Sequence, residues 1–460
     1  MTPVKAHEGL ALEASDMDPR HIPFAQRNLP RYTSYPTAPH FASAVTGATY
    51  AGWLADSAGA GAPLSMYLHV PFCHDICWYC GCNTKAARRR KPVSDYVSML
   101  RAEIGLVAAL TGKSPVRRMH WGGGTPNILT PDDFDAIVGS VREGFDISGL
   151  VEHAIEVDPR RLTSAQAAAF ARQGVTRVSL GVQDFNAHVQ AAIGRIQPAT
   201  AVANAISVLR EHGVQGLSFD LMYGLPLQTV EDACTSARIA IEMSPDRLSV
   251  FGYAHVPWFK ARQRLIDADT LPGLLERSAQ AEAVAQVLRS AGYVEIGLDH
   301  YARADDPLAR AASNGALRRN FQGYVDDDCA GLIGIGASAI SSLPHGYAQN
   351  SPEIGQWARM VVMGDLPVAR GYALTEEDRV RRAIIERILC DFEVDLAPYG
   401  GARAFEGDLQ ELEGATGVDL VRVTGDLVTI PHHARRLTRV VASAFDAFHQ
   451  QSPARHSRAV

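Results

Sequence analysis

The sequence has no hydrophobic run long enough to cross a bilayer, and residues 1–24 lack the apolar core of a secretory signal. The longest weakly polar stretch, AGLIGIGASAISSLP at 330–344, is too short for a span and contains many glycines and serines. We therefore expect a cytoplasmic protein with no membrane span.

The sequence also has no excess of positive charge. Its 44 Lys and Arg residues face 50 Asp and Glu residues, and the formal net charge is -6. Such a chain has no general basic field that would attract nucleic acid or a membrane surface. We expect neither as a partner, and we expect a monomer. Local arginines must meet any anionic ligand, whereas Arg435, Arg436 and Arg439 near the C-terminus are expected on a solvated helix face.

Spaced, paired cysteines are missing as well, which excludes the disulfide framework of a small secreted protein. Four of the seven cysteines lie instead within ten residues, CHDICWYCGC at 73–82. An odd number of cysteines with one tight cluster indicates a reducing compartment and a metal site.

The four clustered cysteines favour an iron–sulfur site over zinc. Zinc is usually bound by two separated pairs of Cys or His ligands, and only His74 lies nearby. A ferredoxin-type cluster needs a fourth cysteine at a ferredoxin spacing, which the short step from Cys80 to Cys82 does not provide. Cys73, Cys77 and Cys80, spaced C-x3-C-x2-C, can hold three irons of a four-iron cluster and leave the fourth iron open. A fourth thiolate would close that iron, so we expect Cys82 to face the substrate instead.

Between residues 64 and 298, short β-branched runs alternate with helical patterns. Apolar residues at three- and four-residue spacing predict a helix over 96–110, and Thr130 with Pro131 marks the start of another. Parallel strands joined by right-handed helical crossovers predict an α/β fold, a full or partial (β/α) barrel, with a flat doubly wound sheet as the alternative. The predicted strands are 64–70, 116–121, 152–157, 175–182, 217–224, 246–253 and 293–298.

The two ends of the chain have a different pattern. Residues 1–60 include LPRYTSYPTAPHF, which has no helical or strand period, and we expect an N-terminal extended arm over the active site. Residues 61–345 should form the catalytic barrel. Residues 346–460 should form a separate, mainly helical C-terminal domain, with a helix in 371–392, a hairpin in 420–430 and a helix in 435–450.

Polar residues follow the ends of six successive predicted strands, which is the rim where barrel enzymes build their sites. Histidines near these ends, at positions 69, 120, 255 and 300, are expected to be hydrogen-bonded neighbours rather than ligands. GIGASA at 334–339 matches a dinucleotide-binding pattern, but no long helix follows it before Pro344. We therefore do not expect a dinucleotide site there. The six strand-end features are the cysteine cluster, GGGTP at 122–126, Glu156, Gln183 with Asp184, Asp220, and YAHVP at 253–257.

With C-x3-C-x2-C followed by GGGTP, the chain resembles the radical S-adenosylmethionine (SAM) superfamily. Within it, the chain resembles the oxygen-independent coproporphyrinogen III oxidases (dehydrogenases) from about residue 30 to the C-terminus. Related haem chaperones lack the counterparts of Cys82 and of the RYTSYP arm. Tyr79 replaces the usual Phe, and Gly252 stands where Asn is common; we expect no change in chemistry. The segments that carry the resemblance are RYTSYPTA, YLHVPFCHDICWYCGCN, HWGGGTP, IEVDPR, LGVQDFN, DLMYGLP, DRLSVFGYAHVP and RRNFQGY.

The resemblance implies oxidative decarboxylation of two propionates of coproporphyrinogen III to vinyl groups, by a radical made from SAM at a [4Fe-4S] cluster. It implies an electron donor such as a flavodoxin or ferredoxin. A non-catalytic, haem-carrying relative is the alternative.

The resemblance also implies ligands for each part of the site. Cys73, Cys77 and Cys80 would hold the cluster, and Cys82 and Tyr67 would take part in catalysis. Two SAM molecules are implied. Residues matching positions around the cluster-bound SAM are Tyr67, Gly123, Glu156 and Ile340; those around the second are Tyr79, Gly124, Thr125, Gln183, Arg195, Asp220 and Ala254. Asp220 suits a ribose diol, with a structural cap as the other interpretation. The four substrate carboxylates need cations, for which Arg31, Arg318 and Arg319 are candidates.

Overall fold

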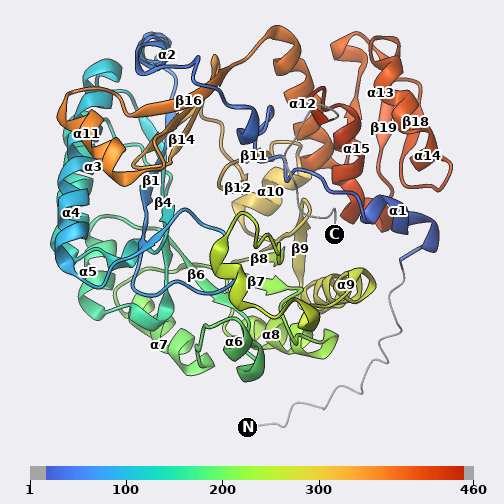
Figure 1. Ribbon diagram of the computed structural model, residues 1–460, viewed down its shortest axis with the longest axis horizontal. Coiled ribbons are helices and arrows are strands. Elements are labelled where there is room, and N and C mark those ends of the chain that lie inside the picture. The colour runs from blue at the N-terminus through green and yellow to red at the C-terminus, as the bar shows by residue number, and fades with distance from the viewer. Residues whose placement is uncertain (1–16, 450–460) are drawn as a thin grey trace.

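The computed structural model describes residues 17–449, which form a large curved sheet covered by helices on its outer side (Figure 1). The sheet has 12 strands in the order β16-β15-β14-β13-β1-β4-β5-β6-β7-β8-β10-β9, so β16 and β9 are open edges and the barrel is partial. The parallel strands are β13 (Gly331–Ile335), β1 (Leu64–Val70), β4 (Val116–Gly123), β5 (Glu152–Val157), β6 (Arg177–Gln183), β7 (Gly216–Tyr223) and β8 (Arg247–Gly252).

Antiparallel strands extend both sides of this parallel centre. The run at 293–298 was expected to continue the parallel series, and this expectation is wrong: the strand formed there lies at the edge and does not pair with β8. The chain reverses at Gly297, whose positive φ of 58° permits the turn, and the returning strand inserts between the two. The antiparallel strands are β9 (Tyr293–Ile296), β10 (His300–Arg303), β14 (Ile340–Leu343), β15 (Gly346–Asn350) and β16 (Val368–Ala373).

Capped amphipathic helices pack on the outside of the sheet. The Thr130 hydroxyl accepts from the Asp133 N–H while the Asp133 carboxylate accepts from the Thr130 N–H, which fixes the start of one helix. One continuous core joins these helices to the strands; Met66 and Leu68 of β1 and Leu100 are wholly buried in it. The helices of this part are α3 (Arg90–Thr111), α4 (Pro131–Gly144), α5 (Ser164–Arg172), α6 (Ala187–Ala192), α7 (Ala199–Glu211), α8 (Val230–Glu242), α9 (Leu274–Ser290), α10 (Pro307–Ser313) and α11 (Ile354–Val362).

An ion-pair network lies at the amino-terminal ends of the parallel strands. Glu152 at the start of β5 is 3.1 Å from Arg177 and 3.4 Å from Arg247, which begin β6 and β8. Asp306 joins the same two arginines. These ion pairs account for the charged residues at the amino-terminal end of the sheet. The polar residues predicted to form the active site lie at the opposite, carboxyl end.

The C-terminal residues surround a second core that the N-terminal arm completes. Leu29, Tyr32 and Tyr35 are buried among its side chains, and the Tyr32 hydroxyl donates to Asp446 at 3.0 Å. In Figure 1 the blue arm accordingly lies beside the red C-terminal elements. These elements are α12 (Glu376–Asp391), β17 (Glu393–Asp395), α13 (Glu406–Glu411), α14 (Glu413–Thr416), β18 (Arg422–Thr424), β19 (Leu427–Thr429) and α15 (Thr438–Ala444).

The first 60 residues also contain helices, α1 (Ile22–Ala25) and α2 (Gly47–Gly59), which the sequence pattern did not indicate. The longer one begins at Thr46, which forms a capping box with Thr49. Between the two helices the Pro- and Tyr-rich stretch forms no β-strand; it consists of bends and irregular backbone with one short 3-10 helix, Ala38–His40. Within residues 17–449, no helix is long and apolar enough to cross a membrane.

Candidate active site

The cysteine loop follows β1 at the carboxyl end of the sheet and begins in β2 (Phe72–Cys73), which pairs with β3 (Lys85–Ala86). Two sulfurs accept hydrogen bonds of 3.4 Å: Cys73 from the Thr84 hydroxyl and Cys77 from the Arg195 guanidinium. Donors aimed at sulfur suit thiolates that ligate iron. The Cys80 thiol has a pKa lowered to about 6, chiefly by its hydrogen bond with Cys82. Three thiols in this setting fit a [4Fe-4S] cluster.

Cys82 differs from the other three cysteines in its exposure. Its side chain is open to solvent, whereas Cys77 is buried and Cys73 and Cys80 are half-buried. The pKa of Cys82 is raised well above its usual value, first by the hydrogen bond with Cys80, and the negative charge of Glu156 contributes. The fourth thiol therefore lies on the side of the loop that faces β5.

The glycines at the end of β4 allow a close approach of backbone and side chains. A Cβ on Gly122 would lie 2.7 Å from Glu156 Oε1, and one on Gly123 would lie 2.8 Å from the His69 ring. A Cβ on Gly124 would lie 2.4 Å from the Phe72 carbonyl oxygen. A side chain at any of the three positions would force a neighbour to shift, and at Gly124 that neighbour is backbone. Gly123 also has a positive φ of 118°, which favours glycine. We refer to residues 122–124 as the glycine ledge.

Replacing Gly124 with alanine should displace the Phe72 backbone that leads into the first cysteine. We expect loss of SAM binding and a destabilisation of about 1–3 kcal/mol, the usual cost of overpacking. Gly105→Ala is the matched control, because its Cβ meets nothing within 4 Å and it lies inside α3. Thermal unfolding and SAM binding of both variants would check this. Normal SAM binding by Gly124→Ala would show that the ledge does not need glycine there.

A chain of polar side chains covers the glycine ledge. The Tyr67 hydroxyl lies 3.0 Å from His69 Nδ1, and His120 Nε2 lies 3.2 Å from Glu156 Oε1. Burial raises the pKa of Tyr67 well above its usual value, so its hydroxyl stays protonated. The four strand-end histidines are hydrogen-bonded as expected; the other two, His255 and His300, bond with Tyr253 and Asp299.

Three of the residues predicted to bind the second SAM lie near the ends of β6 and β7. Arg195 follows α6, donates to the Gly181 carbonyl at 2.5 Å and lies 3.6 Å from Asp158. Gln183 ends β6 with a positive φ of 71°. The carboxylate of Asp220 on β7 has a pKa raised to about 6, first by burial and then by the charge of Glu156.

Gln263 connects two of the predicted positions and was missed from the sequence. Its side-chain amide donates to the Tyr79 carbonyl at 2.8 Å and to the Ala254 carbonyl at 3.2 Å. It is buried within a loop that carries no recognisable motif. Only the folded arrangement brings this loop against the cysteine loop.

Ile340 and Thr125 lie at the two flanks of the site. Ile340 begins β14, and its carbonyl oxygen lies close to Gly334, the residue that pairs with Tyr67 of β1. Thr125 is buried, and its N–H donates to the Phe72 carbonyl at 2.8 Å. The predicted residues thus come from the ends of β1 and β4–β8, from β14 and from the cysteine loop, and they gather at one end of the sheet.

Two of the three arginines that are candidates for binding the substrate carboxylates line one cavity, and the third does not. Arg31 and Arg319 line a cavity of about 1180 Å³, which Ala254 also lines. Arg318 is not among its lining residues and lies 3.8 Å from Glu386. The expectation that the C-terminal arginines lie on a solvated face is wrong: they are half-buried and line the same cavity, because the segment before α15 packs toward α9.

The class of the protein is defined by residues 67–239, which match the model of the radical SAM superfamily. The chain is 46% identical to an oxygen-independent coproporphyrinogen III oxidase of Bradyrhizobium diazoefficiens, covering 95% of this chain and 99% of the relative. A relative of the same name from Paracoccus denitrificans is 39% identical, covering 94% and 96%. The solved coproporphyrinogen III oxidase of Escherichia coli superposes with a TM-score of 0.88 at 36% identity, covering 95% of this chain and 100% of that one. The chain belongs to the family of oxygen-independent coproporphyrinogen III oxidases.

Membership confirms the predicted α/β fold of the radical SAM type and a radical SAM oxidoreductase. The cofactors of this superfamily are a [4Fe-4S] cluster and SAM. The cysteine loop and the glycine ledge fit these two groups, because they offer three clustered thiols next to backbone that carries no side chains.

Proposed function

We propose that the protein catalyses the oxygen-independent oxidative decarboxylation of two propionates of coproporphyrinogen III to vinyl groups, giving protoporphyrinogen IX in haem biosynthesis. The proposal is supported mainly by one feature of the carboxyl end of the sheet. Three thiols, the glycine ledge and the polar side chains of Tyr67, His69, His120 and Glu156 lie next to one another there. The names of relatives that align over nearly the whole chain support the substrate.

The residues of the rim have separate tasks in this reaction. A bound, reduced [4Fe-4S] cluster would supply the electron for reductive cleavage of SAM, and the cleaved SAM would supply the radical chemistry that takes a hydrogen atom from a propionate β-carbon. Cys73, Cys77 and Cys80 hold the cluster, and Arg195 supports the Cys77 sulfur by a hydrogen bond. Each propionate also loses CO2 and one electron, which passes to an acceptor. A radical is needed because no side-chain base can remove this unactivated hydrogen as a proton.

We propose two SAM molecules in the site. Tyr67, Gly123, Glu156 and Ile340 line the place of the first, close to the cysteine loop. The second lies toward the ends of β6, β7 and β8, where Arg195 and Asp220 offer a cation and a carboxylate. The residues assigned to the second are Tyr79, Gly124, Thr125, Gln183, Arg195, Asp220 and Ala254.

Binding of the second SAM should weaken below pH 6, because Asp220 must be ionised to accept two bonds from a ribose diol. A carboxyl with a pKa of about 6 is ionised in about a tenth of molecules at pH 5, so affinity should be about tenfold lower than at pH 7. The charged groups that act on Asp220 are Glu156 of β5, His120 of β4 and His300 of β10.

Equilibrium dialysis of the anaerobic holoenzyme against labelled SAM would measure this effect. The number of bound SAM molecules should fall from two toward one as the pH falls from 7 to 5. Asp220→Asn should bind the second SAM weakly at both values. An Asp220→Asn protein that keeps the pH dependence of the unchanged protein would contradict the role of this carboxylate.

Tyr67 and Cys82 are proposed to act next to the substrate. Both interact with the charge of Glu156, so the three side chains share one space beside the cysteine loop. The Tyr67 hydroxyl can donate a hydrogen bond there, and the Cys82 thiol can exchange a hydrogen atom or a proton with the substrate radical.

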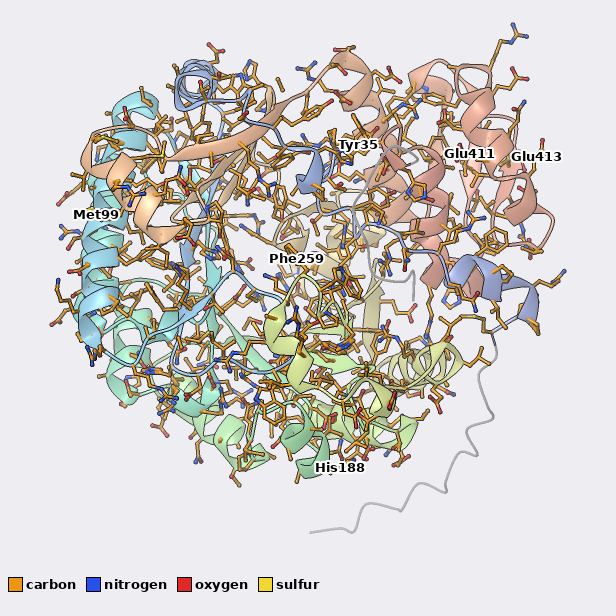
Figure 2. All side chains as sticks on the ribbon, in the orientation of Figure 1. Tyr35, Met99, His188, Phe259, Glu411 and Glu413 are labelled. Carbon is orange, nitrogen blue, oxygen red and sulfur yellow. The ribbon has the colours of Figure 1, made fainter. Side chains whose placement is uncertain are left out.

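We propose a flavodoxin or a ferredoxin as electron donor. Trp258 and Phe259 are 52% and 75% exposed beside the basic residues Lys260, Arg262 and Arg264 (Phe259 is labelled in Figure 2). Lys260 donates to the Cys82 carbonyl at 3.3 Å, so this loop lies directly against the cysteine loop. An apolar patch among cations fits a small acidic carrier.

The remaining assignments are part of the same proposal. We propose a cytoplasmic monomer with an N-terminal arm at 1–60. The expected division into a catalytic barrel at 61–345 and a mainly helical domain at 346–460 cuts through the 12-stranded sheet, because β15 and β16 pair within it; we therefore place the boundary between β16 and α12. The burial of Leu29 and Tyr32 in the C-terminal core and the bond from Arg31 to the Gly252 carbonyl support an arm that reaches the end of β8.

Anaerobic turnover tests the proposed function. With SAM, a one-electron reductant and coproporphyrinogen III, the holoenzyme should form protoporphyrinogen IX together with 5′-deoxyadenosine. Stoichiometric haem binding without decarboxylation would identify a haem carrier instead.

A further inference from the structure

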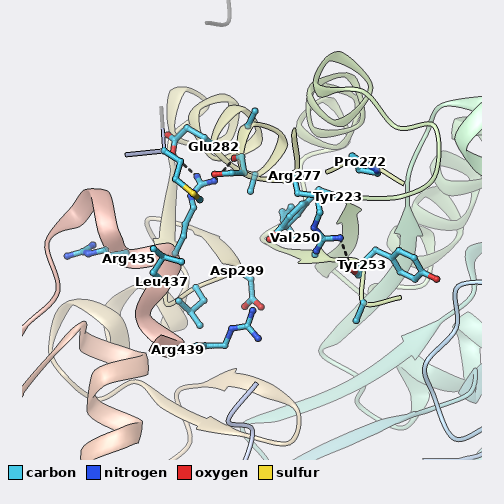
Figure 3. A pocket seen from close by; sticks show the side chains of 18 of the residues that line it. Tyr223, Val250, Tyr253, Pro272, Arg277, Glu282, Asp299, Arg435, Leu437 and Arg439 are labelled. Atoms are coloured by element: carbon cyan, nitrogen blue, oxygen red, sulfur yellow. Dashed lines mark hydrogen bonds and ion pairs between the residues drawn. The ribbon is translucent and has the colours of Figure 1, made fainter. Parts of the chain in front are cut away.

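A cavity of about 1180 Å³ adjoins the proposed SAM site. Its walls come from the ends of β7, β8 and β10, from α9, from the N-terminal arm and from residues 432–439 before and within α15 (Figure 3). Gly252, Tyr253 and Ala254 belong both to this wall and to the strand end beside the second SAM. Its volume is above the usual range for small-molecule sites, so a tetrapyrrole can extend into it.

The cavity wall is rich in arginine. Among the described residues, seven arginines and four acidic residues line it. Two of these arginines are neutralised in the wall itself: Arg289 lies 2.7 Å from Glu282 and 2.5 Å from Glu295, and Arg436 lies 2.6 Å from Glu282. The same wall also contains Arg31, Arg277, Arg319, Arg435 and Arg439.

Three of the arginines surround a single carboxylate. Arg31 donates to the Gly252 carbonyl, Arg319 to the Arg31 carbonyl and Arg439 to the Leu29 carbonyl. Asp299 is the carboxylate among them, and it is already bonded to His300 at 2.7 Å. Figure 3 shows Arg439 directed toward Asp299 across the cavity.

Arg319 has the clearest unmet hydrogen-bonding capacity. Its guanidinium lies 4.4 Å over the ring of Tyr324, and within residues 17–449 its Nε and Nη1 are buried without a hydrogen-bond partner. Burial and the charge of Arg31 lower the pKa of Arg439 to about 10. Buried donors without acceptors are costly, and a carboxylate that accepts two bonds from one guanidinium would satisfy them.

We infer that Arg31, Arg319 and Arg439 bind the propionate carboxylates that the reaction leaves intact. The inference rests on the proposed function, in which two of four propionates lose CO2. The reacting propionates must reach the rim near Tyr67 and Glu156, while the others, at the far side of the macrocycle, enter the arginine cavity. Substrate and product both keep these two carboxylates, so the same anchor holds the macrocycle through both decarboxylations.

Binding of coproporphyrin III, the oxidised macrocycle with the same four propionates, tests the inference without turnover. The unchanged holoenzyme should bind the tetraacid at least tenfold more tightly than its tetramethyl ester. Arg319→Gln should weaken tetraacid binding about tenfold and leave ester binding unchanged, since charge-assisted bonds are lost only for the acid. Arg31→Gln, on the exposed arm residue, should act in the same direction.

Arg318→Gln is the matched control, because this neighbouring arginine is exposed and lies outside the cavity wall. It should bind both ligands like the unchanged protein. Iron content and circular dichroism of each variant establish that it is folded. The inference would be overturned if the ratio of tetraacid affinity to ester affinity were the same in the unchanged protein, Arg319→Gln and Arg31→Gln.

Turnover separates this inference from the proposed function. Arg319→Gln should raise KM more than it lowers kcat, and it should release the monovinyl tricarboxylate intermediate before the second decarboxylation. If the unchanged protein forms no protoporphyrinogen but the arginine variants still lose tetraacid binding, the proposed reaction is refuted and the carboxylate site stands. If turnover is normal in both arginine variants, the site is refuted and the reaction stands.

Discussion

Serine in place of Cys73, Cys77 or Cys80 should yield a folded protein with no four-iron cluster and no SAM cleavage. A serine hydroxyl is not ionised at neutral pH and cannot replace a thiolate as an iron ligand. The loss should be complete for each position, because three ligands are the minimum that holds the cluster while one iron stays open. Iron and sulfide analysis with electron paramagnetic resonance would measure it.

Cys329→Ser is the control for this series. Cys329 is half-buried in a separate loop, where its N–H donates to Asp327. This variant should keep its cluster and its SAM cleavage. A full cluster in the Cys73, Cys77 or Cys80 variant would mean that the iron ligands are assigned wrongly.

Cys82→Ser should have the opposite phenotype: a normal four-iron cluster with strongly impaired porphyrinogen oxidation. Cys82 is exposed, the charge of Glu156 acts on both Cys82 and Tyr67, and we propose that the substrate radical forms beside them. A hydroxyl cannot give up a hydrogen atom or proton as a thiol does. SAM cleavage should continue and become uncoupled from decarboxylation. The measurement is the ratio of 5′-deoxyadenosine to protoporphyrinogen IX.

Two results would contradict this role for Cys82. Loss of the cluster in Cys82→Ser would make it a ligand. Full activity in Cys82→Ala would show that the thiol only packs the loop.

The parallel half of the fold could be predicted from the sequence because its strands are short, largely buried runs that alternate with helical patterns, three of which begin with a capping box. The runs at 64–70 and 152–157 coincide with β1 and β5 to the residue. The antiparallel edge could not be predicted, since β10 is only four residues long and its place between β8 and β9 depends on the reversal at Gly297. The pattern of apolar residues along a strand indicates how deeply the strand is buried, but it does not indicate which strands it pairs with.

The rim of the site was also accessible from the sequence, because barrel topology places successive strand ends together. Gln183 ends β6, and Glu156 and Asp220 lie in the second half of β5 and β7, which are recognisable strands. The arginine cavity was not accessible in this way. Its charges come from the arm, from β11 (Arg318–Asn320), from α9 and from α15, and the C-terminal group looked like an ordinary solvated face. Gln263 escaped notice for the same reason, since long-range packing alone makes it a link between two loops.

Transfer of deuterium from the substrate to 5′-deoxyadenosine tests whether the protein abstracts hydrogen from the propionates. Coproporphyrinogen III deuterated at the β-carbons of its propionates would be incubated anaerobically with the holoenzyme, SAM and a reductant. We expect 5′-deoxyadenosine carrying one deuterium for each vinyl group formed, with protoporphyrinogen IX as the product. Formation of 5′-deoxyadenosine without deuterium, or of no vinyl product at all, would contradict it.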